Sequence, residues 1–159
     1  MFYTLLLTLH NITRWLLIIA AVIALYSAFS GWLGKKAWTK QDDRAGMMFT
    51  SLFDLQVLFG LILYFFVSPI TTAALRNFGA AMSNSSMRFF AVEHFVMMLI
   101  AMGLAHVGRA QSRKAGTDSA KFKRAAIWFT VSVVLLLASI PWPFMAAARP
   151  WLRLGGFMF

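Results

Sequence analysis

Four apolar stretches separated by polar segments divide the chain, at about Trp15 to Leu33, Met47 to Val67, Phe89 to Val107 and Ala125 to Phe144. Each is close to the roughly 20 residues that a helix needs to cross the hydrocarbon core of a bilayer. A lone strand would leave its backbone groups without partners in lipid, so each stretch is predicted to be a helix. The pattern predicts an all-α fold, an integral membrane four-helix up-down bundle that forms one domain over residues 1–159.

The first apolar stretch has the length of a secretory signal peptide but not its other features. It lacks a basic region before the apolar run and a clear small-residue cleavage motif. We therefore expect it to be kept as the first span.

The remaining segments are predicted to lie at the membrane surface. Residues 68–87 form a loop too long for a tight turn, and Thr71 to Phe78 could form a short interfacial helix. Asn84, Ser85 and Ser86 are candidate N-caps for the third span. Pro141 and Pro143 are expected to bend or end the fourth. The tail, residues 145–159, has the aromatic and cationic side chains of an interfacial anchor.

Composition limits the classes of protein and of functional site that the sequence can form. Hydrophobic residues make up 60% of the 159 residues, charged residues 13%, and the mean hydropathy is +0.72, which is unlike an ordinary soluble domain. The sequence contains no Cys, which excludes disulfides, covalent c-type haem attachment, thiolate metal sites and a Cys nucleophile. Any site must be built from other groups.

The formal net charge of +10 is explained by topology. Basic residues flank the apolar stretches instead of lining one soluble face, so we expect a lipid bilayer as partner and no nucleic acid. The positive-inside rule makes the two most basic links cytoplasmic. Both termini and the central loop then face outward, in a bacterial inner membrane. The basic residues of these links are Lys35, Lys36, Lys40, Arg44, Arg109, Arg113, Lys114, Lys121, Lys123 and Arg124.

Few polar groups are expected at membrane depth, and such groups tend to be functional because they are costly there. They are His10, Arg14, Asp54, Gln56, Glu93, His94 and His106. A hydrophobic four-helix bundle with inward histidines can supply two imidazoles to one haem iron. His10 on the first span and His94 on the third are a candidate axial pair for haem b, because these spans are diagonal in an up-down bundle. Three histidines allow one haem at most.

Two arginines could hold the haem propionates. Arg14 shares a face with His10 through the i, i+4 spacing, and Arg88 precedes the third span. Distances counted from the cytoplasmic ends disagree, however, by roughly 15 Å of helix between His10 and His94. Helix tilt, or a third span that runs on toward Arg113, must remove most of this mismatch. In the alternative interpretation, His10 donates to a carbonyl or headgroup and His94 bonds across helices.

Three further residues are candidates for proton transfer or quinone binding. Glu93 could deliver protons, or it could form an ion pair with Arg14 or stay protonated. Asp54 and His106 lie at neighbouring depths, where they could bind a quinone carbonyl or relay protons. They could equally bond to each other and fix helix register.

Three motifs carry a resemblance to a known group of proteins: His10-Asn11-Ile12-Thr13-Arg14-Trp15, Arg88-Phe89-Phe90-Ala91-Val92-Glu93-His94 and Ile140-Pro141-Trp142-Pro143-Phe144. The chain resembles, through most of its length, small four-span bacterial membrane proteins that are labelled cytochrome b-like. Its architecture is also similar to that of cytochrome b561, which implies haem b held by histidine pairs and electron exchange. Only His10 and His94 match such a pair, so the resemblance implies a single outer haem.

We therefore expect a haem b-binding electron-transfer protein, working as a subunit of a larger membrane complex. The alternatives are a cofactor-free accessory subunit of such a complex and a quinone-binding protein. The sequence shows no Ser/His, paired-Asp or His-Glu-x-x-His site of a membrane protease. A stand-alone enzyme is not expected.

Overall fold

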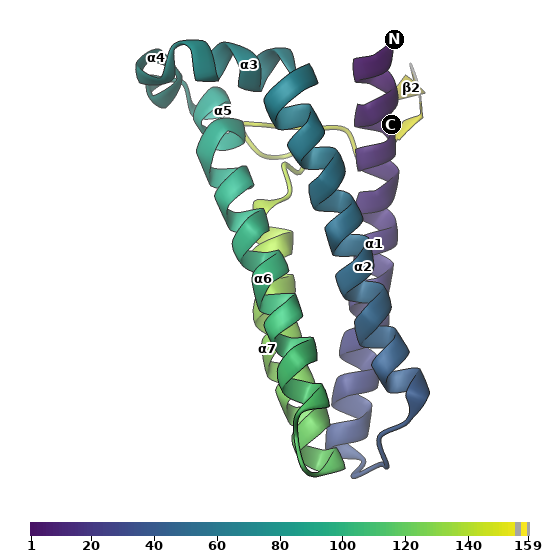
Figure 1. The fold of residues 1–159 in the computed structure, drawn as a ribbon. Helices are drawn as coiled ribbons and strands as arrows, with labels where there is room; N and C mark the ends of the chain where they lie inside the picture. Colours follow the sequence, from purple (N-terminus) through teal and green to yellow (C-terminus); the bar gives the residue numbers. More distant parts are fainter. Residues whose placement is uncertain (155–156, 159) are drawn as a thin grey trace.

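The computed structural model describes residues 1–154 and 157–158, and most of them are helical (Figure 1). The long helices are α1 (Phe2–Leu33), α2 (Lys40–Ile62), α6 (His94–Arg113) and α7 (Asp118–Ser139). A π-helical turn, η1 (Leu63–Val67), extends α2, and another, η2 (Phe89–Glu93), precedes α6. The short helices α3 (Pro69–Arg76), α4 (Phe78–Ser83) and α5 (Ser85–Arg88) connect the two halves.

The described residues contain four helical segments that are long and apolar enough to cross a membrane. This confirms the all-helical class and supports a multi-pass membrane protein. Large apolar side chains are exposed on the outward faces of all four segments, among them Val22, Phe66, Ile100 and Val134. A lipid environment explains such faces, which a soluble protein of this size would not expose.

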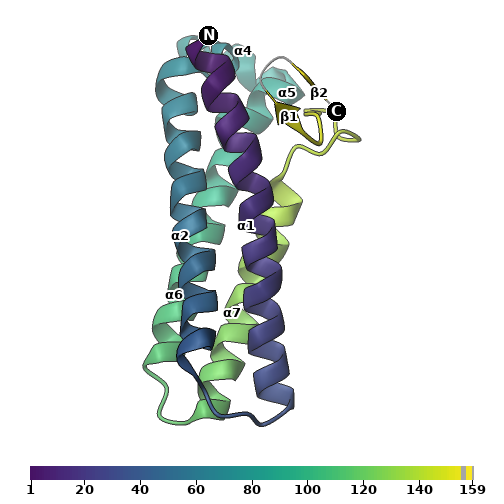
Figure 2. The same ribbon diagram turned by 90° about the vertical axis from the view of Figure 1, so that its right-hand side faces the viewer.

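Neighbouring helices form a four-membered bundle. α1 packs on α2 and α7, and α6 packs on the same two helices, so α1 and α6 occupy opposite corners (Figures 1 and 2). The α1–α2 and α6–α7 connections lie together at one end of the bundle, whereas the chain termini and α3 to α5 lie at the other. This second end is called the terminal end below.

Small side chains allow the helices to approach closely. Ala20, Ala21, Ala24 and Ala28 of α1 are all buried, as small residues usually are between membrane helices. The aromatic rings that fill the centre of the bundle are Phe49, Phe53 and Phe129. The central part of the core is therefore packed with apolar groups. A polar site has room only nearer the terminal end.

Side-chain caps fix where several helices begin. Asp42 and Thr39 form a capping box at α2, where Asp42 Oδ2 accepts from the backbone N–H of Thr39 at 2.9 Å. Ser68, Asn84 and Thr117 cap α3, α5 and α7 through their side-chain oxygens. The expected capping role of Asn84 is therefore confirmed.

The helices extend beyond the predicted spans. α1 begins at Phe2 instead of near Trp15, because residues 2–14 contain no helix breaker, and His10 thus lies within the helix. α7 ends at Ser139, earlier than the predicted Phe144, since Pro141 cannot continue it. The predicted interfacial helix at 71–78 is instead divided between α3 and α4, which meet at Asn77.

The C-terminal tail turns back onto the bundle. Two-residue strands, β1 (Arg153–Leu154) and β2 (Phe157–Met158), pair in antiparallel fashion, and β1 lies against α1. Residues 155, 156 and 159 of the predicted interfacial anchor lie outside the described residues. The described part contacts α1 closely enough to shape the site below.

Candidate functional site: a polar pocket at the terminal end

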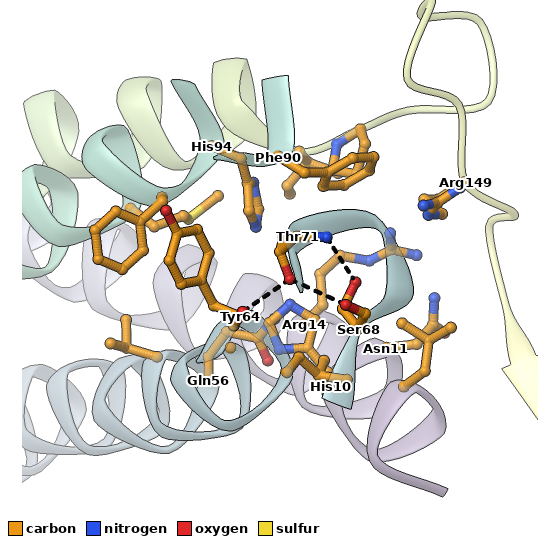
Figure 3. A pocket seen from close by; sticks show the side chains of 18 of the residues that line it. His10, Asn11, Arg14, Gln56, Tyr64, Ser68, Thr71, Phe90, His94 and Arg149 are labelled. Atoms are coloured by element: carbon orange, nitrogen blue, oxygen red, sulfur yellow. Dashed lines mark hydrogen bonds between the residues drawn. The ribbon is translucent and has the colours of Figure 1, made fainter. Parts of the chain in front are cut away.

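A pocket opens between the helices at the terminal end of the bundle (Figure 3). It encloses about 1190 Å³ free of protein atoms, including its open mouth. α1, α2, η1, η2, α6 and the tail all contribute to its wall. Its polar and aromatic lining includes His10, Asn11, Arg14, Gln56, Tyr64, Thr71, Phe90, His94 and Arg149.

The two histidines predicted to form a pair do meet in this pocket. Their ring centroids lie 6.4 Å apart, with the planes at 76°. They approach from the diagonal helices α1 and α6. The anticipated depth mismatch does not keep them apart, because α6 continues to Arg113, which is one of the two remedies expected from the sequence.

Each imidazole is oriented by one protein contact. Nδ1 of His94 lies 2.7 Å from the carbonyl oxygen of Ser139, so Nδ1–H donates there and Nε2 keeps its lone pair. Nε2 of His10 lies 3.1 Å from the side-chain amide of Gln56. Nδ1 of His10 is buried without a hydrogen-bond partner among the described residues.

The side-chain oxygen of Gln56 is likewise buried without a partner in the described part of the chain. The oxygen and nitrogen of an amide have nearly the same shape, so the hydrogen-bond network decides between them. With Oε1 facing His10, it would accept from Nε2–H, and the amide nitrogen of Gln56 would take the buried position that has no partner among the described residues. Nδ1 of His10 then presents a lone pair, as Nε2 of His94 does.

Positive charge gathers at the mouth of the pocket. Arg14 is only 6% exposed, donates to the carbonyl oxygens of Pro150 and Trp151, and leaves its Nε buried without a partner among the described residues. The Arg149 guanidinium lies 4.5 Å from the ring centroid of Phe90. Burial lowers the pKa of Arg149, but a guanidinium stays protonated at neutral pH. The described residues that line the pocket include no Asp or Glu.

Arg88 and Glu93 lie outside this lining. They form a salt bridge of 2.8 Å in which both side chains are nearly half exposed. The suggested ion pair between Glu93 and Arg14 is therefore wrong. Arg88 reaches Glu93 because η2 is a π-helical turn, whose i→i+5 hydrogen bonds place residues five apart on one face.

Asp54 and His106 form a second polar pair away from the pocket. Asp54 Oδ1 and His106 Nε2 are 2.7 Å apart, and the two side chains are 52% and 47% exposed on the surface of the bundle. His106 follows His94 by 12 residues, which is roughly 18 Å of helix. The structure thus brings these two residues together but keeps them separate from the His10–His94 site.

Several pocket residues were not expected from the sequence. Gly60 and Tyr64 line the wall formed by α2 and η1 together with Gln56, which was already among the polar groups expected at membrane depth. The four-residue spacing of the three could have shown that they share a face. Arg149 carried no such signal, because its position depends on how the tail folds back. No family model, curated protein or solved structure matches this chain.

Proposed function

We propose that this protein binds a single haem b between His10 and His94 and takes part in electron transfer. The observation that carries the proposal is the spacing of the two rings. Two imidazoles that would each place a nitrogen roughly 2 Å from a shared metal ion can have ring centroids roughly 6 Å apart, and the observed separation is 6.4 Å. The donor set also fits, since each ring has one nitrogen without a partner among the described residues.

The chain's own residues hold this arrangement. The carbonyl of Ser139 fixes the ring of His94, and the Gln56 amide fixes that of His10, as hydrogen bonds to the second ring nitrogen of a metal-binding histidine do. Apolar side chains such as Phe90, Met98 and Leu136 line the same pocket and exclude water. Haem held in this way would supply one-electron chemistry through its iron.

The proposal includes an orientation. An up-down bundle in a bacterial inner membrane, with its two basic connections in the cytoplasm, follows the positive-inside rule. The terminal end and its pocket then face the outer side, where the haem would exchange electrons with a partner in a larger membrane complex. Arg149 and Arg153 place positive charge at this end as well, which the positive-inside rule does not favour on the outer side. Labelling of single Cys substitutions from each side of intact cells tests the orientation directly.

Absorption spectroscopy tests the haem assignment. The purified protein in detergent should bind added haem and give the spectrum of a low-spin, six-coordinate b-type haem when reduced. His10→Ala and His94→Ala should each lose the six-coordinate spectrum. His106→Ala is the matched control, because it removes an imidazole outside the pocket and should leave the spectrum unchanged.

A protein that binds no haem, or single variants that keep the wild-type spectrum, would overturn the assignment. The first result would favour a cofactor-free accessory subunit. In that case the His10 and His94 contacts would serve packing between helices.

A second candidate function, quinone binding, is favoured by the exposure of the Asp54–His106 pair. A hydrogen-bonded carboxylate and imidazole on the outer face of spanning helices can meet a lipid-soluble headgroup, and polar pairs in this setting are usually functional. The purified protein should then carry quinone at near-stoichiometric content, which Asp54→Asn should reduce. Unchanged quinone content in that variant would leave the pair a structural contact.

A further inference from the structure

We propose that Arg14 and Arg149 form a carboxylate-binding site at the mouth of the pocket, and that the tail is a strap that brings Arg149 there. This inference rests on the proposed haem function and identifies the site as the one that holds the haem propionates. It replaces Arg88, which the sequence suggested for this role and which is paired with Glu93 outside the pocket.

The charges at the mouth are not balanced by the pocket itself. Figure 3 shows the Arg149 side chain reaching from the tail toward Arg14. Arg14, Arg149 and Arg153 all line the pocket, where like charges repel one another, and the described lining residues provide no carboxylate to offset this. An anion between them would remove the repulsion and gain charge-assisted hydrogen bonds.

Arg14 is prepared for such a ligand. Its side chain is almost fully buried, and one terminal nitrogen is committed to the carbonyl oxygens of Pro150 and Trp151. This fixes the plane of the guanidinium, while Nε remains buried with no partner among the described residues. A buried charged donor without an acceptor is costly, and a carboxylate oxygen would satisfy it.

Side chains from about one and a half turns of α1 bind the tail. Asn11 Oδ1 accepts from the backbone N–H of Arg153 at 3.1 Å, and Trp15 Nε1 donates to the carbonyl of Trp151 at 2.8 Å. The backbone N–H of Arg149 donates to the carbonyl of Pro141 at 3.1 Å. Thus the helical segment that presents His10 to the pocket also fixes the strap that delivers Arg149.

Contact with an aromatic ring holds the Arg149 side chain at the mouth. Its guanidinium lies over Phe90 at 4.5 Å, and the Phe90 ring is in turn 6.2 Å from that of His94. A cation–π contact leaves the N–H edge of the guanidinium open to acceptors, and Nη1 on this edge donates to the carbonyl of Ala148 at 3.4 Å. Arg149 can therefore bind a carboxylate beside the imidazole pair without losing its own support.

Titration of the protein in detergent with haem and with haem dimethyl ester tests the inference, because the ester retains the iron but lacks both carboxylates. Wild-type protein should bind haem at least about tenfold more tightly than the ester, as expected for the loss of a charge-assisted hydrogen bond. Arg149→Gln should remove most of that preference by weakening haem binding only. Arg76→Gln, an exposed arginine of α3 outside the pocket, should keep it.

The two proposals can fail separately. Equal affinity of the wild type for haem and ester, with a low-spin six-coordinate spectrum in both, would overturn the carboxylate site and leave the His10–His94 assignment intact. A preference that persists in Arg149→Gln would also overturn it. No six-coordinate spectrum with either compound would overturn both proposals. Ester binding by Arg149→Gln at wild-type strength shows that this variant is folded.

Discussion

The hydroxyl of Tyr64 donates to the backbone carbonyl of Ala91 at 2.7 Å, which links the two π-helical turns directly. Tyr64 belongs to η1 and Ala91 to η2. A π-helical turn departs from the regular i→i−4 hydrogen bonds and often lies at a functional site. The bond therefore ties α2 to α6 at the level where both helices widen beside the pocket.

Tyr64→Phe is expected to destabilise the protein by about 1 kcal/mol, the usual net value of one such hydrogen bond. The stacked contact of its ring with Phe95, at 4.4 Å between centroids, is retained. Thermal unfolding in detergent measures the effect. Tyr26→Phe is the matched control, since Tyr26 is 73% exposed, and an equal loss in both variants would contradict a specific role for the Tyr64 hydroxyl.

Gly60 has no side chain, and the ring of His10 lies in the space beside it. A Cβ at this position would be 3.3 Å from Cε1 of His10, so Gly60→Ala should shift the ring slightly and Gly60→Val should displace it. The expected result is a graded loss of bound haem, measured as haem per protein after purification.

Gly103 provides the control for this series, because a Cβ there has nothing within 4 Å. Gly103→Val should keep the wild-type haem content. Wild-type haem content in Gly60→Val would mean that His10 does not need its observed position.

Trp15 should control how firmly the tail is held. Trp15→Phe keeps a ring but removes the donor to the Trp151 carbonyl, so the tail should open more often. We expect faster cleavage within residues 145–154 during limited proteolysis. Trp32→Phe is the control, because it changes a tryptophan of α1 far from the tail, and it should be cleaved at the wild-type rate. Cleavage at the wild-type rate in Trp15→Phe as well would show that the strap does not depend on the Trp15–Trp151 hydrogen bond.

A double-mutant cycle measures the Asp54–His106 contact. Pairs of this kind contribute about 0.2–1 kcal/mol when exposed, and polar contacts between membrane helices average about 0.6 kcal/mol. Asp54→Asn, His106→Asn and the double variant should therefore show a coupling near 0.5–1 kcal/mol in the free energy of unfolding. A coupling indistinguishable from zero would mean that the 2.7 Å contact does not stabilise the bundle.

Much of the fold follows from local patterns. Apolar length identifies the four long helices, and side-chain chemistry identifies Asn84 as a cap. The His10–His94 pair was also predictable, because few polar groups occur at membrane depth and diagonal helices face the same interior. The limits of α1, of α7 and of the interfacial helix at 71–78 were misplaced, since hydropathy marks where the chain is most apolar and not where a helix must begin or end.

The remaining site depended on contacts that no local pattern encodes. Arg88 precedes the third span and looked suitable for the pocket, but the π-helical geometry of η2 turns it toward Glu93. Arg149 reaches the pocket only because Pro141 ends α7 and Asn11 and Trp15 bind the returning tail. Such long-range bonds are visible only in three dimensions.

Each of the two π-helical turns also changes which face of its helix points into the bundle. Each holds close to one residue more than an α-turn, and one residue corresponds to about 100° around the axis. A helical wheel drawn without a break from Ser85 to Arg113 therefore assigns the residues before Phe89 to the wrong face. Because α2 and α6 both change phase beside the pocket, the residues of these helices that face the pocket do not continue the stripe that faces the alanine-lined core.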